Sequence, residues 1–282
     1  MSTPHPVHPY RPSGFADAAP EFSVPGITAE AGRGVAWITE GWALFKQDPL
    51  MWILAMIIVL GISMAVGFIP MIGSILSSLI WPMLNVGILA FARGLEQGEA
   101  ADINRLFIGF QQQDKRWTLV GVGGVYLAMT MVVAVIAIVL LVVMFLAGGG
   151  MEALSSASSS QAMEEMMRGG FGLGILLVML IALSVLLLVA APAYFFAPAL
   201  VFYANVDIVT AFRESFTAVW RNWLSVMLVY STVAVVIFLV ACIPFGLGLF
   251  VAIPVMMAST YPCFRDIFGR RPGQSGAFVI EN

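Results

Sequence analysis

Charged side chains are scarce in this sequence. Asp, Glu, Lys and Arg make up 10% of its 282 residues, whereas hydrophobic residues make up 60%. Because soluble domains average about 25% charged residues, a water-soluble core could not bury this much apolar surface, and a lipid bilayer is the expected surrounding. The 13 positive residues are scattered along the chain, and the formal net charge is only -3. Nucleic-acid-binding domains instead gather Lys and Arg on one surface, so we expect no nucleic-acid partner.

Cysteine and histidine are also rare. Cys242 and Cys263 lie in apolar stretches and provide neither a disulfide framework nor a paired metal spacing. His5 and His8 both lie near the start of the chain. We find no nucleophile with a neighbouring base, no zinc spacing, no phosphate loop and no paired carboxylates. The sequence therefore predicts a non-enzymatic protein without a cofactor.

Long uncharged runs take up most of the chain. The first extends from Asp48 to Arg93 without a charge between them. At about 1.5 Å per helical residue it is about twice as long as the ~30 Å hydrocarbon thickness of a bilayer. Pro70 and Gly73 lie at its centre, where such a pair breaks a helix. We therefore predict two membrane spans joined by a tight turn.

A run of similar length near the C-terminus is divided by Pro244, and two shorter uncharged runs between them each fit one tilted span. The predicted fold class is an all-α membrane protein with six transmembrane helices. The six spans are residues 50–69, 72–92, 118–147, 173–203, 223–243 and 246–264.

Positive residues predict the orientation of the spans. Cytoplasmic flanks carry an excess of Lys and Arg, and in the six-span arrangement only Arg168 lies on the other side. Both termini are then cytoplasmic. Residues 1–31, rich in Pro, Ala and Ser, are predicted to be a disordered tail, 32–269 the transmembrane domain and 270–282 a second tail. The twelve positive residues on the cytoplasmic side are Arg11, Arg33, Lys46, Arg93, Arg105, Lys115, Arg116, Arg213, Arg221, Arg265, Arg270 and Arg271.

The two long runs resemble each other. A shift of 174 residues places Glu40 on Glu214 and Pro70 on Pro244. We therefore predict a parallel internal duplication of a helix followed by a helical hairpin, with an axis along the membrane normal. The copies are residues 35–98 and 209–269, and after a two-residue gap Arg93 falls on Arg265.

Each copy begins with an amphipathic segment, and Asp207 is the expected N-cap of the second. A third such segment follows Asp102, where Leu106 and Phe110 share one face with other apolar residues. Amphipathic helices of this kind lie in the headgroup plane, and we expect that placement here. The alternative is that all three pack on neighbouring cytoplasmic loops.

Two sets of residues are candidates for a site. Asn85 is one of few polar residues within the spans, and Pro82 and Pro254 lie at similar depths in the two hairpins. An interhelical hydrogen bond and packing kinks are their commoner roles. The second set is a group of charged residues at the cytoplasmic face, whose commoner role is to form anchors and ion pairs at helix ends. These are Glu40, Arg93, Glu99, Arg265 and Asp266.

A methionine-rich outer loop is a weaker candidate. Met151, Met163, Met166 and Met167 supply thioether sulfurs of the kind that suits Cu(I). The serine-rich centre of the loop instead favours a flexible linker, and a metal role for His5 and His8 is equally weakly supported. We predict no metal site.

Four segments of the sequence carry a resemblance to a known family. The segments are 40–49 (EGWALFKQDP), 93–99 (RGLEQGE), 106–110 (LFIGF) and 261–269 (YPCFRDIFG). They resemble a proteobacterial family of uncharacterised inner-membrane proteins, whose layout is similar to the membrane domain attached to some glycerophosphodiester phosphodiesterases. The sequence contains no soluble phosphodiesterase domain, so the resemblance implies an inner-membrane location and a fold, without a catalytic residue.

Two functions remain open from the sequence. The first is an accessory or scaffold component that binds partner proteins or lipids, alone or as a homo-oligomer. The alternative is a transporter or channel for a neutral or amphipathic solute, with a cavity between the two copies near Asn85, Pro82 and Pro254. A membrane-embedded enzyme would require an unexpected cluster of ionisable groups at the cytoplasmic face.

Overall fold

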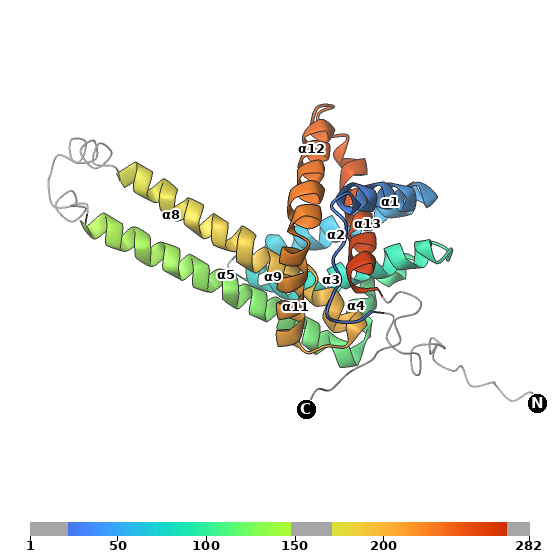
Figure 1. Ribbon diagram of the computed structural model, residues 1–282, viewed down its shortest axis with the longest axis horizontal. Helices are drawn as coiled ribbons and strands as arrows, with labels where there is room; N and C mark the ends of the chain where they lie inside the picture. The colour runs from blue at the N-terminus through green and yellow to red at the C-terminus, as the bar shows by residue number, and fades with distance from the viewer. Residues whose placement is uncertain (1–21, 71, 148–170, 270–282) are drawn as a thin grey trace, which may run out of the picture.

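The computed structural model describes residues 22–70, 72–147 and 171–269, and this part of the chain is all-helical, as predicted. Helical hairpins project from a common body (Figure 1). The hairpin formed by α5 (Gln113–Ala147) and α8 (Phe171–Val185) extends farthest from the body in this view.

The first hairpin follows a short amphipathic helix. The side chain of Asp48 accepts a hydrogen bond from the backbone N–H of Met51 at 3.1 Å and so caps the helix that begins at Pro49. Gly73 begins the return helix, where an added Cβ would lie 2.5 Å from the carbonyl oxygen of Val66. The elements are α1 (Arg33–Gln47), α2 (Pro49–Gly67) and α3 (Gly73–Glu96).

The middle of the chain forms the longest helix and an irregular return. Asp102 caps a short 3-10 helix by accepting from the N–H of Asn104 at 2.9 Å. The return contains π-helical turns and two prolines, Pro192 and Pro198, and ends at Asn205, which has a left-handed φ of 54°. The elements are η1 (Ile103–Phe107), α4 (Ile108–Gln111), α5 (Gln113–Ala147), α8 (Phe171–Val185), η2 (Leu186–Ala190), α9 (Ala191–Phe195), α10 (Ala197–Ala199) and η3 (Leu200–Ala204).

The last hairpin again follows an amphipathic helix. The prediction that Asp207 is its N-cap is confirmed, because the carboxylate accepts from the N–H of Thr210 at 3.0 Å. The turn of the hairpin has positive φ at Phe245 and Gly246. The elements are α11 (Ile208–Arg221), η4 (Leu224–Tyr230), α12 (Ser231–Cys242) and α13 (Leu249–Phe268).

Five helices of the described residues are long and apolar enough to cross a membrane. They coincide with the first five predicted spans. The sixth predicted span falls on α13, which is not among them and carries Arg265 and Asp266 near its end. The five are Pro49–Gly67, Gly73–Glu96, Gln113–Ala147, Gly172–Ala204 and Leu224–Cys242.

The core lies where the returning arms of the hairpins meet. Buried residues concentrate in the second half of α3, in the segment from η2 to η3, and in α13, and α3 contacts both α10 and α13. Amphipathic segments cross these arms closely. An added Cβ on Gly41 of α1 would lie 2.7 Å from the Cβ of Ser259 of α13, and one on Gly87 of α3 would overlap the backbone of Leu106.

The segment before α1 differs from the prediction. Residues 22–30, which we call the strap, pack on the body rather than forming part of a disordered tail. Phe22 is only 2% exposed and contacts the ring of Phe264 with a centroid distance of 4.8 Å. The buried side chain of Asn222 accepts from Ala29 N–H at 2.6 Å and donates to the carbonyl of Ile27 at 3.0 Å. A single phenylalanine in a Pro-rich stretch has no periodicity from which this packing could be predicted.

Candidate functional site

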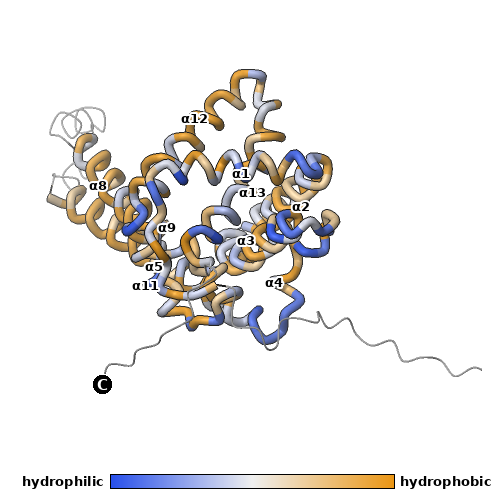
Figure 2. Tube along the Cα trace, turned by 45° about the vertical axis from the view of Figure 1, so that its right-hand side comes forward, coloured by the Kyte–Doolittle hydropathy of each residue, from blue (hydrophilic) through white to orange (hydrophobic). Residues whose placement is uncertain are grey.

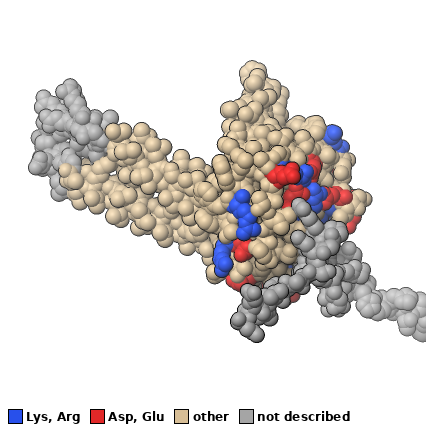
Figure 3. Space-filling view, in the orientation of Figure 1, with Lys and Arg blue, Asp and Glu red and all other residues tan. Residues whose placement is uncertain are grey.

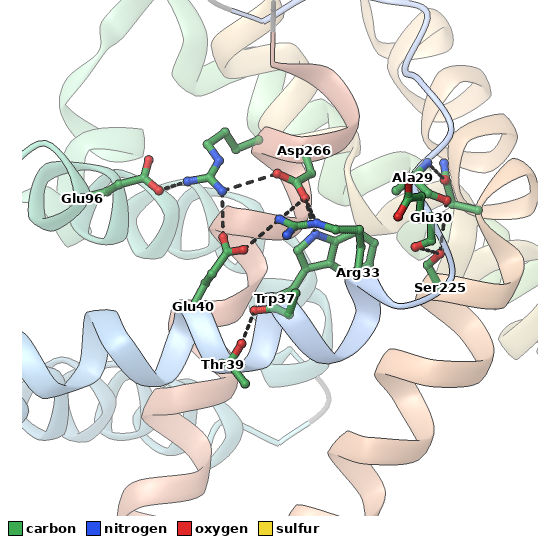
Figure 4. A network of polar contacts seen from close by, with 12 residues as sticks. Ala29, Glu30, Arg33, Trp37, Thr39, Glu40, Glu96, Ser225 and Asp266 are labelled. Atoms are coloured by element: carbon green, nitrogen blue, oxygen red, sulfur yellow. Dashed lines mark hydrogen bonds and ion pairs between the residues drawn. The ribbon is translucent and has the colours of Figure 1, made fainter.

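A network of charged side chains joins α1, α3 and α13 (Figure 4). We call it the charge network and define it as Arg33, Glu40, Glu96, Arg265 and Asp266. α1 contributes the first two residues, the last turn of α3 contributes the third, and the end of α13 contributes the last two. Since these helices lie far apart in the sequence, the network fastens the beginning of the described chain to its end.

Asp266 receives three hydrogen bonds. Its Oδ2 accepts from Arg33 Nε at 2.6 Å and from Trp37 Nε1 at 2.8 Å, and its Oδ1 accepts from Arg265 Nη2 at 3.4 Å. Burial alone would lower the pKa of Arg33, but the hydrogen bonds and charges of Asp266 and Glu40 outweigh it and raise that pKa. Arg33 therefore stays positively charged at any physiological pH.

Glu40 bridges the two guanidinium groups of the network. Its Oε1 accepts from Arg33 Nη2 at 2.8 Å, and its Oε2 accepts from Arg265 Nη2 at 2.7 Å. Arg265 also donates through Nη1 to Glu96. These four side chains are 30–34% exposed, so water and salt screen part of each attraction. Because several pairs share partners, the network holds its geometry better than isolated surface pairs do.

Three of the five charged residues singled out from the sequence, Glu40, Arg265 and Asp266, belong to this network. Sequence reasoning missed Arg33 and Trp37. A signal for Arg33 existed, because it precedes Glu40 by two helical turns and therefore lies on the same face of α1.

The other two predicted residues lie outside the charge network. The guanidinium carbon of Arg93 lies 5.9 Å from the centroid of the Tyr203 ring. Glu99 pairs with Arg105. Glu96, which the network does include, precedes Glu99 by only three residues, and the sequence offers no criterion that selects one over the other.

The charge network is built to hold helices together. Every charged group in it has an opposite charge within hydrogen-bonding distance. The buried indole of Trp37 also donates a hydrogen bond to the network, at Asp266. Across residues 22–70, 72–147 and 171–269, no three His, Cys, Asp or Glu side chains lie close enough to hold a metal ion. The methionine-rich loop, His5 and His8 lie outside the described residues.

The intramembrane candidates lie on two of the returning arms, α3 and α13. Pro82 is buried in α3 and Pro254 in α13, and Asn85 is half-buried, with no hydrogen bond from its side chain to the described residues. A partly open pocket of about 220 Å³ lies between α2, α3, α5 and α9, and none of the three candidates lines it. Its lining is Ile62, Ser63, Val66, Ser77, Ser78, Ile80, Trp81, Leu84, Tyr126 and Tyr194.

The fold and its long apolar helices define a multi-pass α-helical membrane protein. The chain is 29% identical over 109 residues to a Burkholderia thailandensis protein described as a probable inner membrane protein. The match covers 38% of this chain and 40% of that relative, so the chain spans about two fifths of the curated relative it matches. No family model and no solved structure matches the chain.

Proposed function

We propose that this chain is a non-enzymatic scaffold of the inner membrane that binds a partner membrane protein through the α5–α8 hairpin. The observation that carries the proposal is the exposure of this hairpin. In α5 only Leu119, Val122 and Gly123 are buried, and α8 has no buried residue among those described. Beyond Arg116 of α5, the remaining surface of both helices is mostly apolar (Figure 2).

The length of the hairpin also supports a partner. With 35 residues, α5 is about 52 Å long, compared with about 30 Å for the hydrocarbon core of a bilayer. A helix this long must tilt, kink or locally thicken the bilayer, and contact with a partner protein would hold it in one such arrangement. Charged residues gather on the body and are not visible along the hairpin (Figure 3). We therefore propose that the body stabilises the fold, whereas the hairpin binds the partner protein within the membrane.

The inner-membrane location is supported by the Burkholderia relative and by the resemblance of the four sequence segments. We propose six spans with both termini cytoplasmic, with α13 as the sixth. Support comes from the one-sided distribution of Lys and Arg. A reporter fused at Ser158 should then be on the periplasmic side and one at Asn282 on the cytoplasmic side. Fusions that report the same compartment would contradict the six-span arrangement.

We also propose that the duplication extends to a third unit. α1 packs on α13, η1 and α4 pack on α3, and α11 packs on α9 and α10. Each amphipathic segment thus contacts the returning arm of the preceding hairpin, if α1 is taken to follow the last hairpin in a ring. The spacing within the arms supports the same repeat. Pro82, Pro192 and Pro254 precede Arg93, Tyr203 and Arg265, respectively, by the same interval of eleven residues.

The alternative function, transport of a neutral or amphipathic solute, has less support. The pocket between α2, α3, α5 and α9 is lined by none of Asn85, Pro82 and Pro254. It also lies beside the first hairpin, rather than between the two copies on which the prediction was based. Labelling of a cysteine at position 85 by a membrane-impermeant reagent would revive this function.

In-cell photo-crosslinking tests the scaffold function. A photoreactive amino acid is placed at Val139 of α5 or Met179 of α8, which are 53% and 62% exposed. Leu239 of α12, which is 65% exposed, is the matched control. We expect discrete, saturable protein adducts, with this chain or another membrane protein, at the two hairpin positions and lipid adducts alone at the control. Equal protein labelling at all three positions, or none, would exclude the hairpin as a recognition surface.

A further inference from the structure

The pocket between the first hairpin and the long hairpin has an apolar character. Of its ten lining residues none is charged, and Leu84 at its base is 1% exposed. Tyr126 of α5 and Tyr194 of α9 also line it, with their rings tilted by 36° to each other and a centroid distance of 4.4 Å. At about 220 Å³, the pocket exceeds the roughly 150 Å³ of an apolar cavity that accommodates benzene.

The pocket arises where small side chains face each other across the hairpin. Serines occupy three lining positions, and α5 approaches α3 so closely at Gly123 that an added Cβ would overlap the backbone of Ser78. The crossing at Gly123 brings Tyr126, one turn later on α5, to the wall of the pocket. Helix packing therefore fixes the pocket's position but leaves its volume unfilled by protein atoms.

Two of the three serine hydroxyls that line the pocket have no hydrogen left to donate to a bound water. A buried water needs two to four polar partners. The hydroxyl of Ser63 already donates to the carbonyl of Val59 at 2.8 Å, and that of Ser78 donates to the carbonyl of Ser74 at 2.9 Å. Their hydrogens are thus used within their own helices. An empty pocket would in turn forfeit dispersion contacts along all of its walls.

The open side of the pocket faces a hydrocarbon-seeking surface. Trp81, which lines the pocket, is 41% exposed. Met64 and Ile75, on the same two helices, are 53% and 40% exposed. Both helices are candidate membrane spans, so the molecules in contact with this opening are the chains of bilayer lipids.

From this geometry we propose that the pocket binds one hydrocarbon chain of a bilayer phospholipid, held between α2–α3 and α5–α9. The hydrocarbon chain of the lipid fills the volume that the small serine side chains leave. It thereby contacts both the first hairpin and the base of the α5–α8 hairpin. The site depends on membrane placement but not on a protein partner of the α5–α8 hairpin.

Photolabelling of the purified full chain in phosphatidylcholine nanodiscs tests this site. The probe is a phosphatidylcholine with a diazirine on one acyl chain, and labelled peptides are mapped by mass spectrometry. We expect labelling within residues 62–66 and 77–84 at least about five times that of the exposed α8 surface around Met179, saturating as the probe fraction rises. Labelling of the pocket no stronger than that of α8 would overturn the proposal, because the lipid would then only surround the protein.

Filling the pocket provides the second measurement. Ser63→Leu adds a side chain within the pocket, whereas Ser184→Leu on the exposed face of α8 is the matched control, since Ser184 also donates to a carbonyl of its own helix at 2.7 Å. We expect Ser63→Leu to reduce pocket labelling about fivefold and to leave α8 labelling unchanged, with Ser184→Leu resembling the wild type. If a folding defect affects Ser63→Leu, Ser77→Leu provides the same test from α3. Unchanged pocket labelling in a folded filling variant would contradict the proposal.

Discussion

The body and the α5–α8 hairpin are both rich in apolar residues but are stabilised differently. In the body, helices from both ends of the chain cross at glycine and serine, and ion pairs and buried aromatic rings join them. In the hairpin, α8 packs on α5, which also packs on α3, and both helices expose most of their apolar surface. Composition alone therefore does not determine burial in a membrane protein. The difference lies in where small residues allow a second helix to approach.

The largest expected effect tests packing in the body. Phe91 is 1% exposed and packs edge-on against Trp52 with a centroid distance of 4.8 Å. Phe91→Ala should lower the free energy of unfolding by about 3 kcal/mol, because it leaves a cavity. Val139→Ala on the hairpin, where the side chain is 53% exposed, should change it by less than about 0.5 kcal/mol. Steric-trap unfolding in bicelles measures both, and equal losses would remove the contrast between the two regions.

The next effect tests close helix crossing. Gly41→Ala would place a Cβ 2.7–2.8 Å from the backbone and Cβ of Ser259, so α1 and α13 must move apart at a cost of about 2 kcal/mol. Gly61→Ala on α2 is the control, because no atom lies within 4 Å of the added Cβ. It should be neutral or stabilising, since alanine is the better helix former. Thermal unfolding in detergent should show opposite signs; a stable Gly41→Ala variant would contradict the crossing.

A smaller effect concerns the charge network. Asp266→Asn removes the negative charge that Arg33 and Arg265 share, and should cost about 1 kcal/mol after allowance for solvent screening. Glu99→Gln, which breaks a pair whose carboxylate is 48% exposed, should cost less. A double-mutant cycle between Arg33→Met and Asp266→Asn measures the coupling directly. A coupling energy of zero would mean that the network adds no stability.

The smallest effect is a pH dependence of the α11 cap. Hydrogen bonds from the side chain and the backbone N–H of Thr210 lower the pKa of Asp207. A carboxylate with a lowered folded-state pKa stabilises the cap fully at pH values above its unfolded-state pKa of about 4. This stabilisation is lost as the pH falls through the folded-state pKa. Hydrogen exchange at Thr210, corrected for intrinsic rates, should lose protection on acidification in the wild type. Asp207→Asn should show no such change, and a wild-type response equally flat would contradict the cap.

The sequence predicted much of the fold because its signals are local. Uncharged runs predict long helices, Pro70 marks a turn, and Asp207 caps a helix regardless of what packs nearby. The charge network could be predicted only in part, since Arg33 and Asp266 are 233 positions apart. Phe22 could not be placed at all, because its burial depends on rings from α13 and η3 that no pattern around it indicates.

The connection between the two ends of the chain has a consequence for biosynthesis. Asp266, the distant partner of Arg33, is synthesised 233 residues after it, which at about 5–20 residues per second takes on the order of tens of seconds. Until then, the indole of Trp37 and the crossing face of α1 lack the helix that covers them. A nascent chain interrupted before α13 would thus leave this face uncovered at the membrane surface, where quality-control proteases could distinguish it from the finished protein.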